Sequence, residues 1–140
     1  MPQLQIREIM THDLTTLPSD STIFEACQSM RDADIGCIVI SDDDGIYGVV
    51  TDRDIVVRCV AEGKDPQKTR LRDICSRELC ALSPGDSLEK ATKLMRDKAL
   101  RRLVVVEGKK PVGIVSLGDL AQTMDRKSVL GAISAATPNH

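Results

Sequence analysis

The stretch Gly-Val-Val-Thr-Asp-Arg-Asp at residues 48–54 returns 65 positions later as Gly-Ile-Val-Ser-Leu-Gly-Asp at residues 113–119. Working outward from this pair, residues 6–55 align with residues 71–120 without a gap, and 12 of the 50 aligned pairs are identical. A unit of this length, present twice, does not fit a solenoid array of many short repeats. The repeat therefore indicates two equivalent subdomains related by a pseudo-twofold axis.

Each copy predicts the same order of elements, β-α-β-β-α. A short strand and a turn lead into a helix, which opens with capping-box chemistry at Thr22-x-x-Glu25 in one copy and at Asp86-x-x-Glu89 in the other. Two apolar runs joined by a polar turn then predict a β-hairpin. The predicted strands are residues 15–17, 37–40 and 46–50 in the first copy and 80–82, 103–106 and 112–115 in the second.

The fold class that follows is α/β (α+β), with two β-α-β-β-α repeats packed sheet against sheet, because a copy of about 50 residues buries only a poor core alone. The expected boundaries are residues 6–60 for repeat 1, 61–70 for a linker, 71–124 for repeat 2 and 125–140 for a C-terminal tail. The polar linker, with its Gly and Pro, is predicted to be an exposed spacer. The tail is predicted to pack its apolar stretch 128–134 on the domain or on a partner.

Composition excludes several function classes. The chain has 140 residues, with 19 basic and 21 acidic side chains and a formal charge of -2, which argues against a basic nucleic-acid binder. Its aromatic residues are Phe24 and Tyr47, too few to form a stacking platform for single-stranded nucleic acid. No apolar run approaches the ~20 residues of a membrane span, and the N-terminus lacks the regions of a signal peptide. We therefore expect a cytoplasmic protein that binds neither nucleic acid nor membrane.

The repeated motif admits two interpretations. Thr51 and Ser116 stand where a strand becomes a helix, and Asp54 and Asp119 follow three residues later. A hydroxyl and a carboxylate at this spacing form a capping box at a helix N-terminus. The same carboxylate can instead accept two hydrogen bonds from a ribose diol, with the helix N–H groups facing a phosphate. Both interpretations stay open.

The doubled motif, in register within a doubled β-α-β-β-α frame, resembles a tandem pair of cystathionine β-synthase (CBS) domains, the Bateman module. The resemblance covers residues 6–124 and is closest to small stand-alone bacterial CBS-pair proteins. It implies a regulatory, non-enzymatic module that senses an adenosine-containing nucleotide in a cleft between the repeats. AMP, ADP or ATP come first as ligands, ahead of S-adenosylmethionine or NAD. It also implies a homodimer and a regulated protein partner that the sequence does not name.

The resemblance assigns residues to two clefts. The first cleft takes its residues from both copies: Ser116, Asp119, Arg101 and Arg102 from the second, and Thr11, Leu14, Thr15, Ile35 and Gly36 from the first. The two arginines match the family position where basic groups face phosphates, and a guanidinium suits phosphate geometry.

The second cleft pairs Thr51 and Asp54 of the first copy with residues of the second copy. These residues of the second copy are Cys75, Leu79, Cys80 and Leu100. Here Gly36 and Cys37 stand where the second copy has its two arginines, which removes two phosphate partners. The second cleft is therefore expected to prefer a nucleoside, to bind weakly or to stay empty, and the Asp119 cleft ranks first.

Two alternatives from other classes remain. The five cysteines are odd in number and show no disulfide spacing, so free thiols are expected. Cys75 and Cys80, with His12 in the matching loop, form a weak alternative as a zinc or redox-sensing site. The other alternative is a protein-binding scaffold whose clefts stay empty. No arrangement of residues supports a catalytic pair, and no cofactor is expected.

Overall fold

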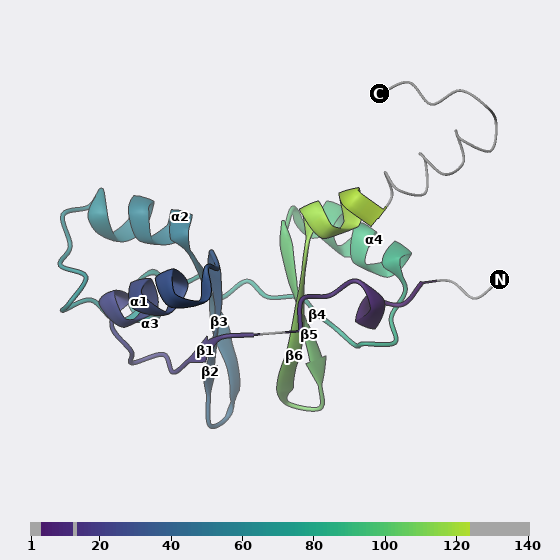
Figure 1. The fold of residues 1–140 in the computed structure, drawn as a ribbon, viewed down its shortest axis with the longest axis horizontal. Helices are drawn as coiled ribbons and strands as arrows, with labels where there is room; N and C mark the ends of the chain where they lie inside the picture. Colours follow the sequence, from purple (N-terminus) through teal and green to yellow (C-terminus); the bar gives the residue numbers. More distant parts are fainter. Residues whose placement is uncertain (1–3, 13, 124–140) are drawn as a thin grey trace, which may run out of the picture.

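The computed structural model describes residues 4–12 and 14–123 of the chain (Figure 1). Repeat 1 contains β1 (Thr16–Leu17), α1 (Ile23–Ala33), β2 (Cys37–Asp42), β3 (Gly45–Thr51) and α2 (Asp52–Ile55), which continues as a π-helical stretch over Val56–Val60. Repeat 2 contains β4 (Ala81–Leu82), α4 (Leu88–Lys98), β5 (Arg102–Glu107), β6 (Lys110–Ser116) and a helix that runs through 117–123. A short helix opens each repeat, a 3-10 turn at Ile6–Glu8 in repeat 1 and α3 at Leu71–Ile74 in repeat 2.

The two repeats build the same small sheet. In each, the first strand pairs in parallel with the second, and the second pairs antiparallel with the third, giving the orders β1-β2-β3 and β4-β5-β6. The predicted β-α-β-β-α order and α/β class are confirmed. The strands of each hairpin extend beyond the predicted apolar runs, because the pairing continues into polar residues up to tight turns after Asp42 and Glu107.

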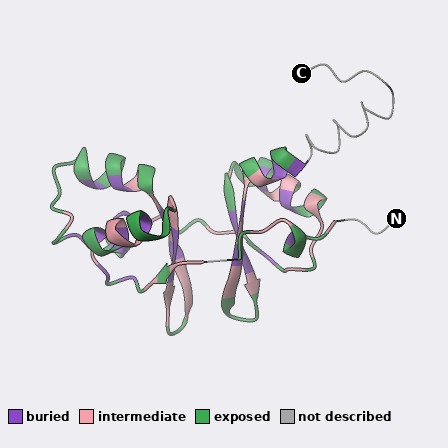
Figure 2. Cartoon of the chain, in the orientation of Figure 1, coloured by how far each residue is buried: buried purple, intermediate pink, exposed green. Residues whose placement is uncertain are grey.

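The two sheets face each other, and the helices cover their outer faces (Figure 1). Side chains alternate along β2: Ile38 and Ile40 belong to the core beneath the helices, whereas Val39 between them is buried outside that core. Val104 of β5 occupies the equivalent position in repeat 2. This alternation is what lets each thin sheet contribute to its own core and to the layer between the repeats (Figure 2).

Helix α4 begins one residue later than predicted. The Ser87 hydroxyl accepts a hydrogen bond from the Lys90 amide at 3.1 Å, so Ser87 is the N-cap. Asp86 is instead held in the preceding turn, where its carboxylate accepts from the Ser83 amide at 2.7 Å. In α1 the predicted cap is confirmed, because the Thr22 hydroxyl accepts from the amide three residues on. Ser87 aligns with Thr22 at the 65-residue offset, so the alignment of the two copies indicates Ser87 as the N-cap of α4.

The opening segment of each repeat packs on the other repeat. Ile6 is fully buried in the core of repeat 2, whereas Leu71 and Ile74 lie in the core of repeat 1. Backbone hydrogen bonds hold this exchange, among them Ile6 N–H to the Asp86 carbonyl at 2.8 Å. Each hydrophobic core therefore includes side chains from the opening segment of the other repeat.

The linker is more than the exposed spacer that was predicted. Its last residues lie against the start of α1, where the Ile23 amide donates to the Thr69 carbonyl at 2.9 Å and the Phe24 amide donates to the Pro66 carbonyl at 3.0 Å. The linker thus supplies acceptors for N–H groups that a helix N-terminus leaves unpaired. The tail, residues 125–140, lies outside the described residues. None of the helices in the described part of the chain has the length and apolar character needed to cross a membrane.

Candidate functional site

The exchanged segments also pair with the sheet edges. Thr11 and Ile114 of β6 exchange backbone hydrogen bonds of 2.9 and 3.1 Å, and Ser76 pairs with Val49 of β3 in the same way. The glycine of the repeated motif permits this approach: a Cβ at Gly113 would lie 3.1 Å from the Thr11 carbonyl oxygen and would also strike Met10. The pairing carries repeat-1 residues across to the end of β6.

At the end of β6 the chain turns into the helix 117–123. The Ser116 amide donates to Asp119 Oδ2 at 2.9 Å, and the Asp119 amide donates to the Ser116 hydroxyl at 3.0 Å. This reciprocal pair is a capping box, so the first interpretation of the motif holds. It uses one carboxylate oxygen. No hydrogen bond or ion pair among the described residues engages the other oxygen, Oδ1.

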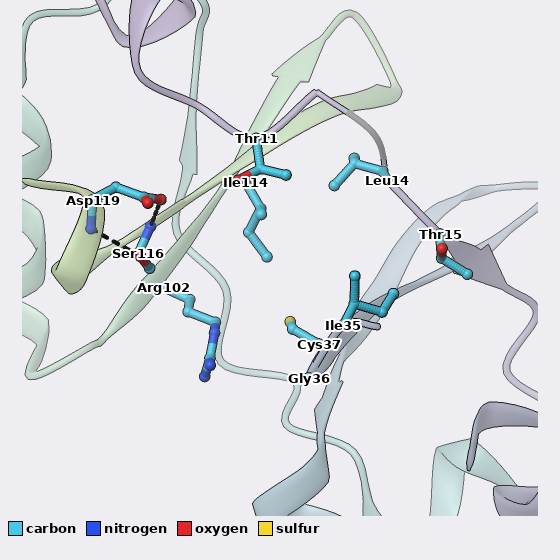
Figure 3. A pocket seen from close by; sticks show the side chains of 10 residues that line it. All are labelled: Thr11, Leu14, Thr15, Ile35, Gly36, Cys37, Arg102, Ile114, Ser116 and Asp119. Atoms are coloured by element: carbon cyan, nitrogen blue, oxygen red, sulfur yellow. Dashed lines mark hydrogen bonds between the residues drawn. The ribbon is translucent and has the colours of Figure 1, made fainter. Parts of the chain in front are cut away.

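Asp119 and Ser116 line a pocket of about 230 Å³ between the repeats (Figure 3). Figure 3 shows residues of repeat 1 and repeat 2 facing the same space. The lining consists of Thr11, Leu14, Thr15, Ile35, Gly36, Cys37, Arg102, Ile114, Ser116 and Asp119. It thus combines aliphatic side chains with one carboxylate, one guanidinium and hydroxyl groups, a mixture typical of small-molecule sites.

The structure brings together all but one of the residues that the sequence assigned to the first cleft. The exception is Arg101, which lies in the bend just before β5 begins at Arg102 and does not line this pocket. Its backbone carbonyl accepts from the Leu117 amide at 2.8 Å, and its side chain lies beside a separate hollow along α4. Sequence reasoning had missed Cys37 and Ile114, although the 65-residue offset aligns Cys37 with the pocket residue Arg102.

The residues assigned to the second cleft are less well gathered. Leu79, Cys80 and Leu100 line a hollow to which neither Thr51 nor Asp54 contributes. Thr51 and Asp54 form their own capping box, with bonds of 2.9 and 3.1 Å. The Oδ1 oxygen of Asp54 lies 3.9 Å from the Nε atom of Arg58, so a cation already stands beside it. Asp119 has no such partner among the described residues.

Three of the cysteines, Cys27, Cys37 and Cys75, are poorly suited to thiolate chemistry. Burial raises the pKa of the Cys37 thiol to about 11, with Asp54 and Asp52 adding to the rise and Arg102 opposing it. Burial likewise raises the pKa values of Cys27 and Cys75. These three thiols are protonated near neutral pH, and a protonated thiol is a weak nucleophile.

The described residues do not support the alternative of a zinc site. Among the described residues, no three His, Cys, Asp or Glu side chains are grouped so as to hold a metal ion. His12, Cys75 and Cys80 all lie within that described part, and they do not come together as such a group.

The family profile of the CBS domain matches residues 6–60 and 71–126, which together make up most of the chain. The chain belongs to the CBS domain family. A curated relative, the CBS domain-containing protein YhcV of Bacillus subtilis, is 39% identical over 116 residues, which are 83% of this chain and 82% of YhcV. The chain therefore carries two CBS domains in tandem and is homologous to bacterial CBS-pair proteins.

Solved structures share the fold. A hexameric CBS-CP12 protein from bloom-forming cyanobacteria matches with a TM-score of 0.79 and 28% identity over 90% of this chain and 74% of that one. Hypoxic Response Protein I with two coordinated zinc ions matches with a TM-score of 0.73 and 32% identity over 85% of this chain and 98% of that one. The CBS domain pair of protein MJ0100, in complex with 5′-methylthioadenosine and S-adenosyl-L-methionine, matches with a TM-score of 0.78 and 21% identity. The match covers 90% of this chain and 99% of that one.

Proposed function

We propose that this CBS pair is a non-catalytic regulatory module that reversibly binds an adenosine-containing ligand in the Asp119 pocket. The observation that carries the proposal is the state of the Asp119 carboxylate. One oxygen fixes its position through the capping box, and the other lacks a partner among the described residues at the wall of a pocket shared by both repeats. A held carboxylate with a vacant oxygen is suited to a ribose diol.

The rest of the pocket provides for the other parts of such a ligand. Leu14, Ile35 and Ile114 offer aliphatic surface on which a purine base can pack. Arg102 offers a guanidinium that suits a phosphate. The hydroxyls of Thr11, Thr15 and Ser116 add donors and acceptors between these two ends.

Ligand binding at this place would couple the repeats. Thr11 and Ile35 come from repeat 1, whereas Arg102 and Asp119 come from repeat 2. A ligand that contacts all four stabilises one relative orientation of the repeats over others, and that shift in population is the signal.

The ligand class includes AMP, ADP and ATP first, then S-adenosylmethionine and NAD. The pocket volume of about 230 Å³ favours a mononucleoside ligand over a dinucleotide such as NAD, because ligand pockets usually span roughly 300–1,000 Å³. The CBS domain pair of MJ0100 shares this fold and is in complex with two adenosyl compounds. That complex supports adenosine as the part that the candidate ligands have in common.

A cytoplasmic homodimer completes the proposal. Repeat 1 leaves large apolar side chains exposed on its helices: Phe24, Val56, Val57 and Val60. Apolar side chains gathered on exposed helices are typical of surfaces that bind another protein chain. Analytical ultracentrifugation tests the dimer, and a single monomeric species at micromolar concentration would contradict it.

The binding proposal is tested by thermal shift with AMP, ADP, ATP, NAD and S-adenosylmethionine. A ligand at a hundred times its Kd stabilises the fold by about 2.7 kcal/mol, which raises the Tm of a chain of this size by about 5–10 °C. Asp119→Asn should abolish the shift, because it keeps an oxygen acceptor for the cap and loses the charge. Asp54→Asn, the same change in the other repeat, is the matched control and should keep it.

The possible outcomes separate the candidates. Loss of the shift in Asp119→Asn alone supports the proposal. No shift with any of the five compounds in the unmodified protein overturns it and leaves the scaffold with empty clefts. A shift that both variants retain places binding elsewhere and also overturns the site.

A further inference from the structure

The charges around the pocket are mostly negative. Of its lining residues, Arg102 is the cation and Asp119 the carboxylate. A second carboxylate, that of Asp52, lies against the wall: a Cβ on Gly36 would be 2.9 Å from Asp52 Oδ2, and the Asp52 amide donates to the Gly36 carbonyl at 3.0 Å. Asp52 and Asp54 both raise the pKa of Cys37 in the pocket wall, so their fields reach the pocket.

The backbone donors near the pocket are largely used. At the start of the helix 117–123, the amides of Ser116 and Asp119 donate within the capping box, and that of Leu117 donates to the Arg101 carbonyl. An N-terminus binds phosphate through free N–H groups, so the anion-binding capacity here is reduced. The amide of Gly118 makes none of these bonds, but Gly118 is exposed and does not line the pocket.

A single phosphate can therefore be satisfied, and a chain of phosphates cannot. Among the lining residues, Arg102 supplies the guanidinium donors for one phosphate group. A second and a third group would bring further negative charge toward Asp52 and Asp119 without a further cation among the lining residues. Like charges repel, and solvent screens the partly buried carboxylate of Asp119 less than the exposed carboxylate of Asp52.

We propose that the Asp119 pocket selects adenosine ligands with at most one phosphate and discriminates against ADP and ATP. This inference rests on the proposed function and narrows its ligand class. Adenosine, AMP and adenosyl compounds without phosphate are accepted, and each added phosphate weakens binding.

The test is isothermal titration calorimetry of the full chain with adenosine, AMP, ADP and ATP, without magnesium and at constant ionic strength. We expect ATP to bind at least about tenfold more weakly than AMP, the factor that repulsion between two unit charges about 12 Å apart produces at an effective dielectric near 20. ADP should fall between them.

Two variants identify the groups responsible. Arg102→Gln should lower the affinity for AMP to that for adenosine and leave the affinity for adenosine unchanged. Arg101→Gln is the matched control, because this neighbouring arginine lies outside the pocket, and it should change neither affinity. Asp52→Asn keeps an oxygen that can accept the 2.8 Å hydrogen bond from the Arg53 amide. This variant should reduce the difference in affinity between AMP and ATP.

Failure of this inference and failure of the proposed function give different results. ATP binding as tightly as AMP, or tighter, overturns the discrimination and leaves adenosine binding intact. Absence of heat with all four compounds, together with no thermal shift, overturns the proposed function itself. Equal effects of Arg102→Gln and Arg101→Gln would show that general surface charge, rather than the pocket, sets the affinity.

Discussion

Ser116 and Asp119 hold each other, each donating its backbone amide to the side chain of the other, at 2.9 and 3.0 Å. Asp119 therefore stabilises the start of the helix and, in our proposal, also recognises the ligand. Asp119→Ala should lower the free energy of unfolding by about 0.5–1.5 kcal/mol even without ligand, the usual net contribution of one hydrogen bond, here the one that its carboxylate accepts from the Ser116 amide. Asp119→Asn should lower it less, because an acceptor remains. Urea unfolding measures both, and equal stability of Asp119→Ala and the unmodified protein would contradict the role of the cap.

The motif glycines should tolerate alanine unequally. A Cβ at Gly48 would collide with the Ser76 backbone carbonyl, whereas at Gly113 the closest atoms belong to the flexible side chain of Met10. We expect Gly48→Ala to cost about 1–3 kcal/mol of stability, the range for overpacking, and Gly113→Ala to cost less. Gly118→Ala is the control, because its Cβ would meet Ser116 Oγ at an ordinary 3.6 Å. Thermal unfolding ranks the three, and a Gly48→Ala protein as stable as the control would contradict the close approach.

The exchange of leading segments predicts long-range effects of Ile6. This side chain is fully buried in the core of repeat 2, so Ile6→Ala should destabilise the fold by about 2–5 kcal/mol and should loosen repeat 2 first. Leu117→Ala, at a position 50% exposed, should change stability by less than about 0.5 kcal/mol. Hydrogen exchange gives the local readout. Loss of protection in β2 and β3, with β5 and β6 unaffected, would contradict the exchange.

The raised pKa of Cys37 predicts a loss of stability in alkali. The thiol is stabilised in its protonated form in the folded chain, so its contribution is full below the unfolded pKa of 9.0 and is lost as pH rises through about 11. Cys37→Ala should remove this pH dependence, which amounts to about 2–3 kcal/mol at 1.36 kcal/mol for each pKa unit. Urea unfolding of both proteins at pH 8 and pH 11 measures the difference. Parallel losses in the two proteins would show that Cys37 is not the group responsible.

Much of the site was predictable because the repeat is visible in the sequence. The spacing of Ser116 and Asp119 indicated a strand that turns into a capped helix, and the structure has that turn. Family resemblance then suggested which residues of the other copy face it. Arg101 shows where such reasoning fails: it is adjacent to Arg102 in sequence, yet it lies in the bend before β5 and lines a different hollow.

The sequence by itself determined the two repeats, the order of their elements and the residue types at the motif, because these depend on local periodicity and on short-range hydrogen bonds. Only the tertiary structure decided that the leading segments cross between the repeats, that Asp52 lies against Gly36, and that one guanidinium rather than two enters the pocket. These features join residues far apart in the chain. They arise from how two thin sheets bury their second faces against each other, and no local pattern specifies that packing.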